Sequence, residues 1–174
     1  MTSGLPPRIS TTRGQFVEKA YSAQLELAAL PRLRDALEGD TADIQVEMEL
    51  GWDKHWRRPS MHLIMHLKLS LQCQRCMQPM QWSSQVENHL LLNSGSDDFE
   101  GPEAMDIAQA EEGEVETLSL IEDEILLALP LVPLHASDTP CGKTEVDEIA
   151  EESPVDNARA DNPFAALAAL KTKH

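Results

Sequence analysis

The residues with the clearest potential for chemistry are two cysteines at the spacing of a metal-binding turn, Cys73 and Cys76. A tight turn through a Cys-x-x-Cys segment points both sulfurs toward one ion, as zinc knuckles do. A closed zinc site needs four ligands, and the only other cysteine in the chain is Cys141. The candidate metal ligands are therefore Cys73, Cys76 and Cys141. The fourth ligand has three histidine candidates, His62, His66 and His135.

Two other interpretations of the cysteine pair stay open. The thiols could form a reduced pair that only packs within a turn, or a thioredoxin-like redox pair, although no strand–CxxC–helix context surrounds them. With a single Cys-x-x-Cys the sequence predicts no cofactor, and structural zinc is kept as the alternative. His62 and His66 would lie about 13 Å apart on one strand, too far to share an ion. We expect them on a solvated strand face, with His89 standing alone.

A second candidate site is a group of basic residues close to aromatic ones in the sequence. Cations beside aromatic rings can stack unpaired bases, so the pattern indicates an RNA contact. The alternative is that the tryptophans fill gaps in the core. The basic candidates are Arg57, Arg58, Lys68 and Arg75. The tryptophans near them are Trp52, Trp56 and Trp82.

Catalytic motifs are not apparent in the sequence. It contains no Walker loop, no G-x-S-x-G, no G-x-G-x-x-G and no HExxH. Glu122, Asp123 and Glu124 are candidate interaction residues, but consecutive residues on a helix point in different directions and bind one cation poorly. Ser119 and Glu122 fit a capping box, and acidic side chains stabilise a helix N-terminus. We therefore predict a protein that is not an enzyme.

Charge is distributed unevenly along the 174 residues. The chain carries 30 acidic and 14 basic side chains, for a net charge of −16. Residues 76–142 contain 14 of the acidic side chains and neither lysine nor arginine. This balance argues against a simple basic protein that grips RNA phosphates. The acidic stretch is either a solvated surface or a surface that meets a basic partner, such as a ribosomal protein.

Composition also excludes several classes of protein. Three cysteines are too few for a disulfide-stapled secreted scaffold. The chain has no apolar run of about 18 residues, so no transmembrane helix is expected. Residues 1–10 lack the apolar region of a signal peptide. We expect a cytoplasmic protein whose partners include neither membrane nor DNA.

Hydrophobic periodicity predicts an α+β domain over residues 1–135, built on an antiparallel sheet of about four strands with a few short helices. Alternating apolar residues place strands at 24–29, 43–50, 61–73 and 82–92. The last two should form a hairpin with the cysteine pair at its tip. Helices are predicted from Pro31 to Gly39 and from Ser119 to Pro130.

The remaining segments are predicted to pack little. Residues 93–116 read as a long acidic loop. Residues 136–161 read as a disordered acidic linker within a partly disordered C-terminal tail. Residues 162–173 carry a narrow apolar stripe and are predicted to form an amphipathic helix.

Four segments, in their order along the chain, resemble the YceD family, the large ribosomal RNA subunit accumulation proteins of bacteria and plastids. They are CQRCMQP from Cys73, LSLIEDEILLALPLVPLH from Leu118, Cys141, and NPFAALAALK from Asn162. The resemblance covers nearly the whole chain. It implies a non-catalytic role in the synthesis, processing or stability of 23S ribosomal RNA. The implied partners are a large-subunit RNA precursor, or a ribosomal or RNA-maturation protein.

The resemblance brings no catalytic residues with it. Some family members carry further cysteines near the C-terminal end, whereas this chain has only Cys141 there, so a bound metal would be structural. Two alternative functions stay open. One is an acidic carrier or adaptor for a single basic ribosomal protein. The other is a metal-dependent nuclease or thiol-based enzyme, which only the cysteine pair and the acidic triplet support.

Overall fold

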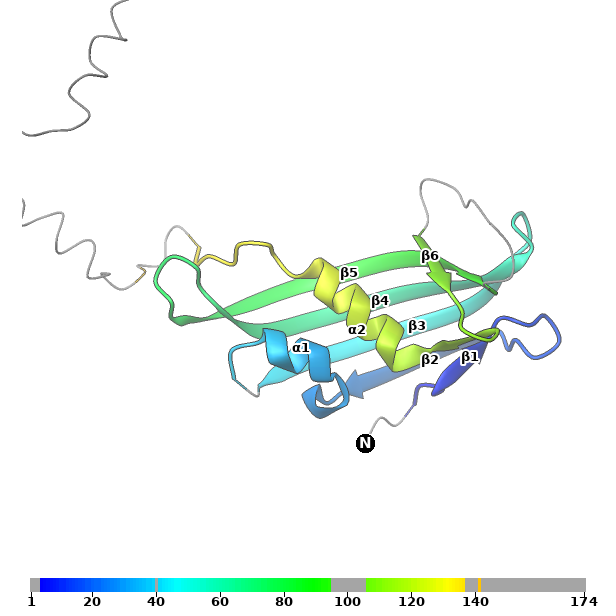
Figure 1. Cartoon of the computed structure of the whole chain (residues 1–174), viewed down its shortest axis with the longest axis horizontal. Helices are drawn as coiled ribbons and strands as arrows, with labels where there is room; N and C mark the ends of the chain where they lie inside the picture. Colours follow the sequence, from blue (N-terminus) through cyan, green and yellow to red (C-terminus); the bar gives the residue numbers. More distant parts are fainter. Residues whose placement is uncertain (1–3, 40, 95–105, 137–140, 142–174) are drawn as a thin grey trace, which may run out of the picture. The chain divides into compact units, whose positions relative to one another are not determined.

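A five-stranded sheet in the order β2-β3-β4-β5-β6 forms the body of the structure (Figure 1). This computed structural model describes residues 4–39, 41–94, 106–136 and 141, all within one compact unit of residues 1–141. The strands are β2 (Lys19–Leu25), β3 (Ala42–Asp53), β4 (Arg58–Gln72), β5 (Pro79–Asn93) and β6 (Asp106–Gln109). Neighbouring strands are antiparallel, except that β6 runs parallel to β5. The predicted α+β class is confirmed, although the sheet has five strands rather than about four.

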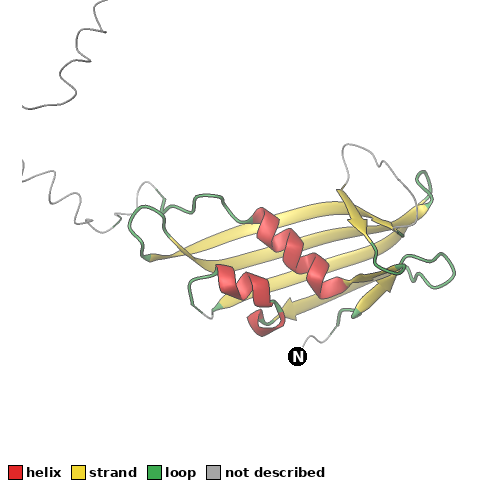
Figure 2. Cartoon of the chain, in the orientation of Figure 1, coloured by secondary structure: helices red, strands yellow, loops and turns green. Residues whose placement is uncertain are grey.

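The other elements lie around this sheet. A short antiparallel ribbon pairs β1 (Arg8–Ser10) with β7 (Glu114–Glu116). The 3-10 turn η1 (Leu27–Ala29) and helix α1 (Pro31–Ala36) connect β2 to β3, and helix α2 (Thr117–Ala128) follows β7. Both helices lie across the same face of the sheet (Figure 2).

Apolar alternation along the strands decides which face of the sheet is covered. In β4, Met61, Leu63, Met65, Leu67 and Leu69 are all buried. The helices add their own buried side chains to this layer: Leu33, Ile121 and Ile125. Between the buried positions the opposite face carries polar side chains, as antiparallel sheets with one solvated face do. The core is built mainly from Leu, Ile, Val and Met.

The hairpin predicted around the cysteine pair is confirmed, since β4 and β5 pair antiparallel on either side of it. The strand predicted at 24–29 is wrong in its bounds. β2 begins at Lys19, and residues 27–29 turn so that Leu27 is buried beside α1. Because Leu25 and Leu27 are both buried, the turn mimics the alternation of a strand.

The prediction of one uninterrupted acidic loop at 93–116 is wrong for the part that the structure describes. Residues 106–109 form β6 and residues 114–116 form β7. The acidic residues of this stretch are interspersed with small apolar residues that are buried: Ala108, Ala110 and Val115. A strand of three or four residues is too short for periodicity to reveal it.

Two predictions fall outside the described residues. They are the linker at 136–161, apart from residues 136 and 141, and the helix at 162–173. The compact unit extends past the predicted domain end at 135, because Cys141 contacts the β4–β5 turn. Neither described helix has both the length and the apolar character needed to cross a membrane.

Candidate functional site

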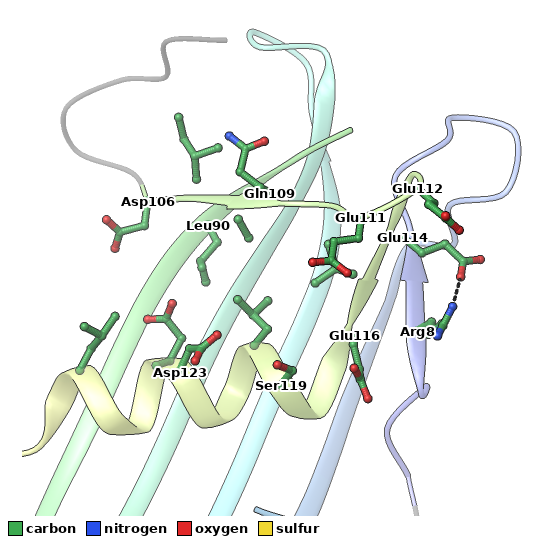
Figure 3. Close-up of a pocket in the computed structure, with 16 residues that line it drawn as sticks. Arg8, Leu90, Asp106, Gln109, Glu111, Glu112, Glu114, Glu116, Ser119 and Asp123 are labelled. Carbon is green, nitrogen blue, oxygen red and sulfur yellow. Dashed lines mark hydrogen bonds and ion pairs between the residues drawn. The ribbon is translucent and has the colours of Figure 1, made fainter. Parts of the chain in front are cut away.

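An acidic cleft of about 800 Å³ lies where β6, β7 and α2 meet (Figure 3). Seven carboxylate side chains line it: Asp106, Glu111, Glu112, Glu114, Glu116, Asp123 and Glu124. Among the described lining residues, Arg8 is the only basic one. The lining also includes apolar side chains, of which Leu127 on α2 is 80% exposed. The cleft therefore combines a concentrated negative charge with accessible apolar surface.

Short local structures aim these carboxylates at the cleft. In β7, Val115 points into the core, so Glu114 and Glu116 point away from it. Glu111 and Glu114 exchange backbone hydrogen bonds of 2.9 and 3.0 Å across a tight turn. Glu112 and Gly113 turn the chain there with φ angles of 52° and 80°. On α2, Ile121 and Ile125 face the sheet, which leaves Asp123 on the side of the helix away from the sheet, where it lines the cleft.

Two arginines compensate part of this negative charge. Arg8 pairs with Glu114 at 3.2 Å, and both side chains are substantially exposed. Arg32 of α1 pairs with Asp123 at 2.5 Å, and the other five carboxylates have no lysine or arginine among the described lining residues to pair with except Arg8. Burial raises the pKa of Glu124, and the charges of Asp106 and Asp123 raise it further against the opposing hydrogen bond from Asn88. The carboxylates thus repel one another, and a cationic ligand would relieve that repulsion.

The predicted acidic triplet divides between two tasks. Glu122 lies outside the cleft and is only 4% exposed. It accepts hydrogen bonds from the backbone N–H of Leu33 at 3.0 Å and from Arg32 Nε at 2.8 Å. Asp123 also pairs with Arg32, at 2.5 Å, and lines the cleft together with Glu124.

The predicted capping box is wrong. α2 begins at Thr117, so Ser119 lies inside the helix and makes no cap, and no side chain caps this N-terminus. Glu122 reaches α1 instead of the start of its own helix. The contact of Glu122 with Leu33, 89 residues away in the sequence, thus replaces the capping contact that the Ser119–Glu122 spacing predicts.

The predicted basic patch is not brought together. Arg57 and Arg58 lie at the β3–β4 turn, whereas Arg75 lies at the β4–β5 turn. The 15 residues of β4 separate these turns by roughly 50 Å. Lys68 lies between them and pairs with Asp43 at 3.4 Å. Arg58 is committed to the structure, since it donates to Asn93 Oδ1 at 2.6 Å.

A smaller basic and aromatic group does form at the β3–β4 turn. The guanidinium of Arg13 lies 5.4 Å from the centre of the Trp52 ring, and Phe16 packs against the same ring. Arg13, Lys54 and Arg57 are exposed there. Arg13 was not among the predicted basic residues, because the loop that carries it is distant in sequence from the β3–β4 turn. Trp82 packs against the core, as the alternative interpretation of the tryptophans expects.

The structure brings the three cysteines together at the β4–β5 turn and adds His135. Cys73 Sγ lies 3.9 Å from Cys141 Sγ. His135 Nδ1 lies 3.4 Å from Cys76 Sγ and 3.5 Å from Cys141 Sγ. We call these four residues the thiol cluster. Of the three histidines considered as a fourth ligand, His135 is the one that joins the cysteines.

The environment of the thiol cluster alters two thiol pKa values. Burial opposes ionisation of Cys73, but the backbone groups of His135, Cys76 and Arg75 outweigh it and lower the pKa of Cys73 to about 5. For Cys76, the backbone of Gln78 favours the thiolate, whereas burial and the neighbouring sulfurs raise the pKa. Arg75 Nε donates to Cys141 Sγ at 2.9 Å.

His89 is not alone, contrary to expectation. It lies directly across from His62 in the β4–β5 pairing, with the rings stacked at 4.1 Å between centroids. Glu87 Oε1 lies 2.9 Å from His62 Nε2 and 3.9 Å from His89 Nε2. His66 is exposed on the same polar face of the sheet. The pattern of a single strand does not predict this contact between His62 and His89, because the two residues lie on different strands.

Comparison with known proteins places the chain in a family. The family profile "Large ribosomal RNA subunit accumulation protein YceD" matches residues 61–171, well over half of the chain. The chain belongs to the YceD family. A YceD-family relative from Haemophilus influenzae, the "Large ribosomal RNA subunit accumulation protein YceD", is 31% identical over 152 residues. That alignment covers 83% of each protein. No solved structure matches.

The resemblance noted in the sequence is therefore confirmed. The matched range includes most of β4, the whole of β5 and α2, the thiol cluster and most of the acidic cleft. Both candidate sites thus belong to the part of the chain that relates it to the YceD family.

Proposed function

We propose that this YceD-family protein supports accumulation of large-subunit (23S) ribosomal RNA by binding a basic protein segment in its acidic cleft. The segment would belong to a ribosomal protein or an RNA-maturation protein, and the protein would act in the cytoplasm. The observation that carries the proposal is the cleft itself, which is lined by seven carboxylates, of which Glu114 pairs with Arg8 and Asp123 with Arg32. The name of the Haemophilus influenzae relative supports the RNA part of the role.

Charge favours a protein ligand over RNA in this cleft. RNA phosphates would be repelled by the carboxylates, whereas lysine and arginine side chains would be attracted. The exposed Leu127 at the cleft offers the apolar contact that a protein segment needs besides charge. Residues 76–142 carry no lysine or arginine that could compete for the cleft from within that stretch.

A binding role also explains the arrangement of the cleft carboxylates better than a catalytic role does. The sequence lacks the catalytic motifs considered above, and the carboxylates of the cleft come from a turn, two short strands and a helix. Such a spread suits an extended basic ligand rather than one reacting centre. The role of an acidic carrier for one ribosomal protein is a narrower form of the same proposal.

A binding experiment with two probes separates protein from RNA ligands. The immobilised chain is incubated with RNA-free proteins extracted from large ribosomal subunits and, separately, with protein-free ribosomal RNA. We expect one basic protein, identified by mass spectrometry, to bind in stoichiometric amount. Its binding should fall as salt rises from about 0.05 M to about 0.5 M, because added ions screen charges at the surface.

Matched variants assign that binding to the cleft. The cleft variant combines four exposed substitutions, Asp106→Asn, Glu111→Gln, Glu112→Gln and Glu116→Gln. The control variant makes the same charge change elsewhere, with Asp35→Asn, Glu18→Gln, Glu47→Gln and Glu49→Gln. We expect the cleft variant to lose at least roughly tenfold in affinity, about 1.4 kcal/mol, and the control to lose much less.

Two results would contradict the proposal. One is equal binding of the basic protein by the cleft variant and the control variant. The other is tight binding of protein-free RNA that is lost in a turn variant, Arg13→Gln, Lys54→Gln and Arg57→Gln. That outcome would favour an RNA contact at the β3–β4 turn instead.

A further inference from the structure

The thiol cluster assembles four side chains from three separate parts of the chain. Cys73 and Cys76 belong to the turn between β4 and β5, His135 to the extended segment after α2, and Cys141 to a position six residues further on. Cys73 and Cys76 are buried, while His135 and Cys141 are half-buried. All four ligand atoms lie within 4.8 Å of one another. Cysteines gathered only by packing would not need to aim a histidine nitrogen at two sulfurs.

The separations fit the edges of a zinc tetrahedron. Zn–S bonds of about 2.3 Å and Zn–N bonds of about 2.05 Å give edges of about 3.8 Å between sulfurs and about 3.6 Å between sulfur and nitrogen. The observed edges are 3.9 Å for Cys73 to Cys141, and 3.4 and 3.5 Å from His135 Nδ1 to its two sulfurs. A disulfide does not explain the closest sulfurs, because its S–S length is about 2.05 Å.

The backbone around the cluster holds the ligands in place. Cys73 N–H donates to Gln78 O at 3.0 Å, and Met77 N–H donates to Cys73 O at 2.8 Å, which closes the turn. Gln74 N–H donates to Pro133 O at 2.9 Å and thereby joins the segment that carries His135 to the turn. The turn that carries Cys73 and Cys76 is thus held by hydrogen bonds that do not involve the two sulfurs.

Charge is balanced as a zinc-thiolate site requires. Three thiolates and one neutral imidazole around Zn²⁺ leave a net charge of −1. The guanidinium of Arg75 lies next to this charge, with Nε 2.9 Å from Cys141 Sγ. A hydrogen bond from a cation to a ligand atom is a typical outer-shell contact in metal sites.

We propose that Cys73, Cys76, His135 and Cys141 bind one structural Zn²⁺ that fastens the segment after α2 to the β4–β5 turn. The site is structural because four protein ligands close the tetrahedron and leave no position for substrate. Zinc would thereby fix the end of the compact unit, where the chain has no sheet partner among the described residues. This inference is independent of the proposed function.

Metal binding by the whole purified chain tests this inference. The reduced chain, freed of metal, is titrated with Co²⁺ and then with Zn²⁺. We expect one equivalent of Co²⁺ to give the visible bands of a tetrahedral site and a thiolate charge-transfer band, and Zn²⁺ to displace it. Cys141→Ser should weaken affinity more than roughly 100-fold, since loss of an outer-shell partner alone costs 10- to 100-fold. Arg75→Ala should fall within that outer-shell range.

A second cluster provides the control. His62, Glu87 and His89 also offer ligand atoms within 4.8 Å of one another, but no sulfur. The double variant His62→Ala, His89→Ala should keep the thiolate spectrum and its stoichiometry. No tetrahedral cobalt spectrum in the wild type would overturn the inference. Loss of the metal in the histidine double variant but not in Cys141→Ser would overturn it as well.

Cys141→Ser guards against misfolding, because Cys141 lies outside every strand and helix. Circular dichroism should show that this variant keeps the wild-type secondary structure. A folded Cys141→Ser chain that binds zinc as tightly as the wild type would also refute the site.

Discussion

The carboxylate of Glu122 in α2 accepts a hydrogen bond of 3.0 Å from the backbone N–H of Leu33 in α1. Its other oxygen lies 2.8 Å from Arg32 Nε, and the side chain is only 4% exposed. Because α1 has no side-chain cap of its own, Glu122 satisfies an N–H group that a helix leaves unpaired in its first turn. The two helices are therefore joined by a buried polar contact as well as by apolar packing.

Glu122→Ala should destabilise the fold more than any single change in the cleft. It leaves the Leu33 N–H and part of the Arg32 guanidinium without their partner, which should cost about 2–4 kcal/mol. Urea unfolding followed by circular dichroism measures this cost. Asp123→Ala is the matched control, because its half-exposed pair with Arg32 should contribute less than about 1 kcal/mol. Equal effects of the two substitutions would show that the buried contact has no special weight.

Glu124 makes stability depend on pH. Burial raises its pKa above the ordinary value of 4.5. Its contribution is therefore fully present below that value, and it is lost as pH rises through the raised pKa of the folded state. Glu124→Gln removes this loss and can still accept the hydrogen bond from Asn88.

The difference in Tm between Glu124→Gln and wild type should therefore grow between about pH 4 and about pH 7. Thermal unfolding at several pH values measures it, with Glu47→Gln on the polar face of the sheet as the control. A difference that shrinks as the pH rises would contradict the assigned direction.

Asn93 attaches β6 to the sheet. Its side chain is fully buried, accepts from Arg58 Nη1 at 2.6 Å and donates to Gln109 Oε1 at 3.0 Å. Its carbonyl accepts from Ala110 N–H at 2.7 Å. Asn93→Ala should open this edge strand, so hydrogen exchange at Ala108 and Ala110 should speed up at least roughly tenfold. In Gln85→Ala, an exposed position on the same strand, those amides should exchange at the wild-type rate.

Zinc removal should lower thermal stability if the thiol cluster binds zinc. Free zinc at about 100 times its Kd stabilises a folded protein by about 2.7 kcal/mol, provided the unfolded chain does not bind it. A chelator should therefore lower the Tm of the wild type while leaving that of Cys76→Ser unchanged. An equal response of both proteins to the chelator would argue against a structural metal.

The sequence predicted the elements that depend on residues close together in the chain, such as β4 and the β4–β5 hairpin. Alternation along residues 61–73 predicted the buried face of β4 and most of its length, because five or more consecutive pairs of positions repeat the same signal. The hairpin was predicted from two alternating segments separated by a short turn, and the cysteine pair lies in that turn. These predictions required no knowledge of distant parts of the chain.

Predictions failed where distant segments meet. Nothing in the spacing could select His135 from among three histidines, because the path after α2 brings it to the β4–β5 turn. Arg57 and Arg75 looked close in sequence, but a long strand holds them apart. Glu122 was predicted to cap its own helix, but its carboxylate contacts α1 instead. The acidic cleft was visible only as a charge run, since its shape depends on two strands too short to detect.

The ratio of large-subunit to small-subunit ribosomal RNA in cells lacking this protein tests the central claim most directly. The cells are complemented with the wild type, the cleft variant or the control variant, each confirmed by immunoblot to accumulate equally. We predict a selective fall in 23S RNA that the wild type and the control variant restore and the cleft variant does not. Full restoration by the cleft variant, or no fall in 23S RNA when the protein is absent, would contradict the account.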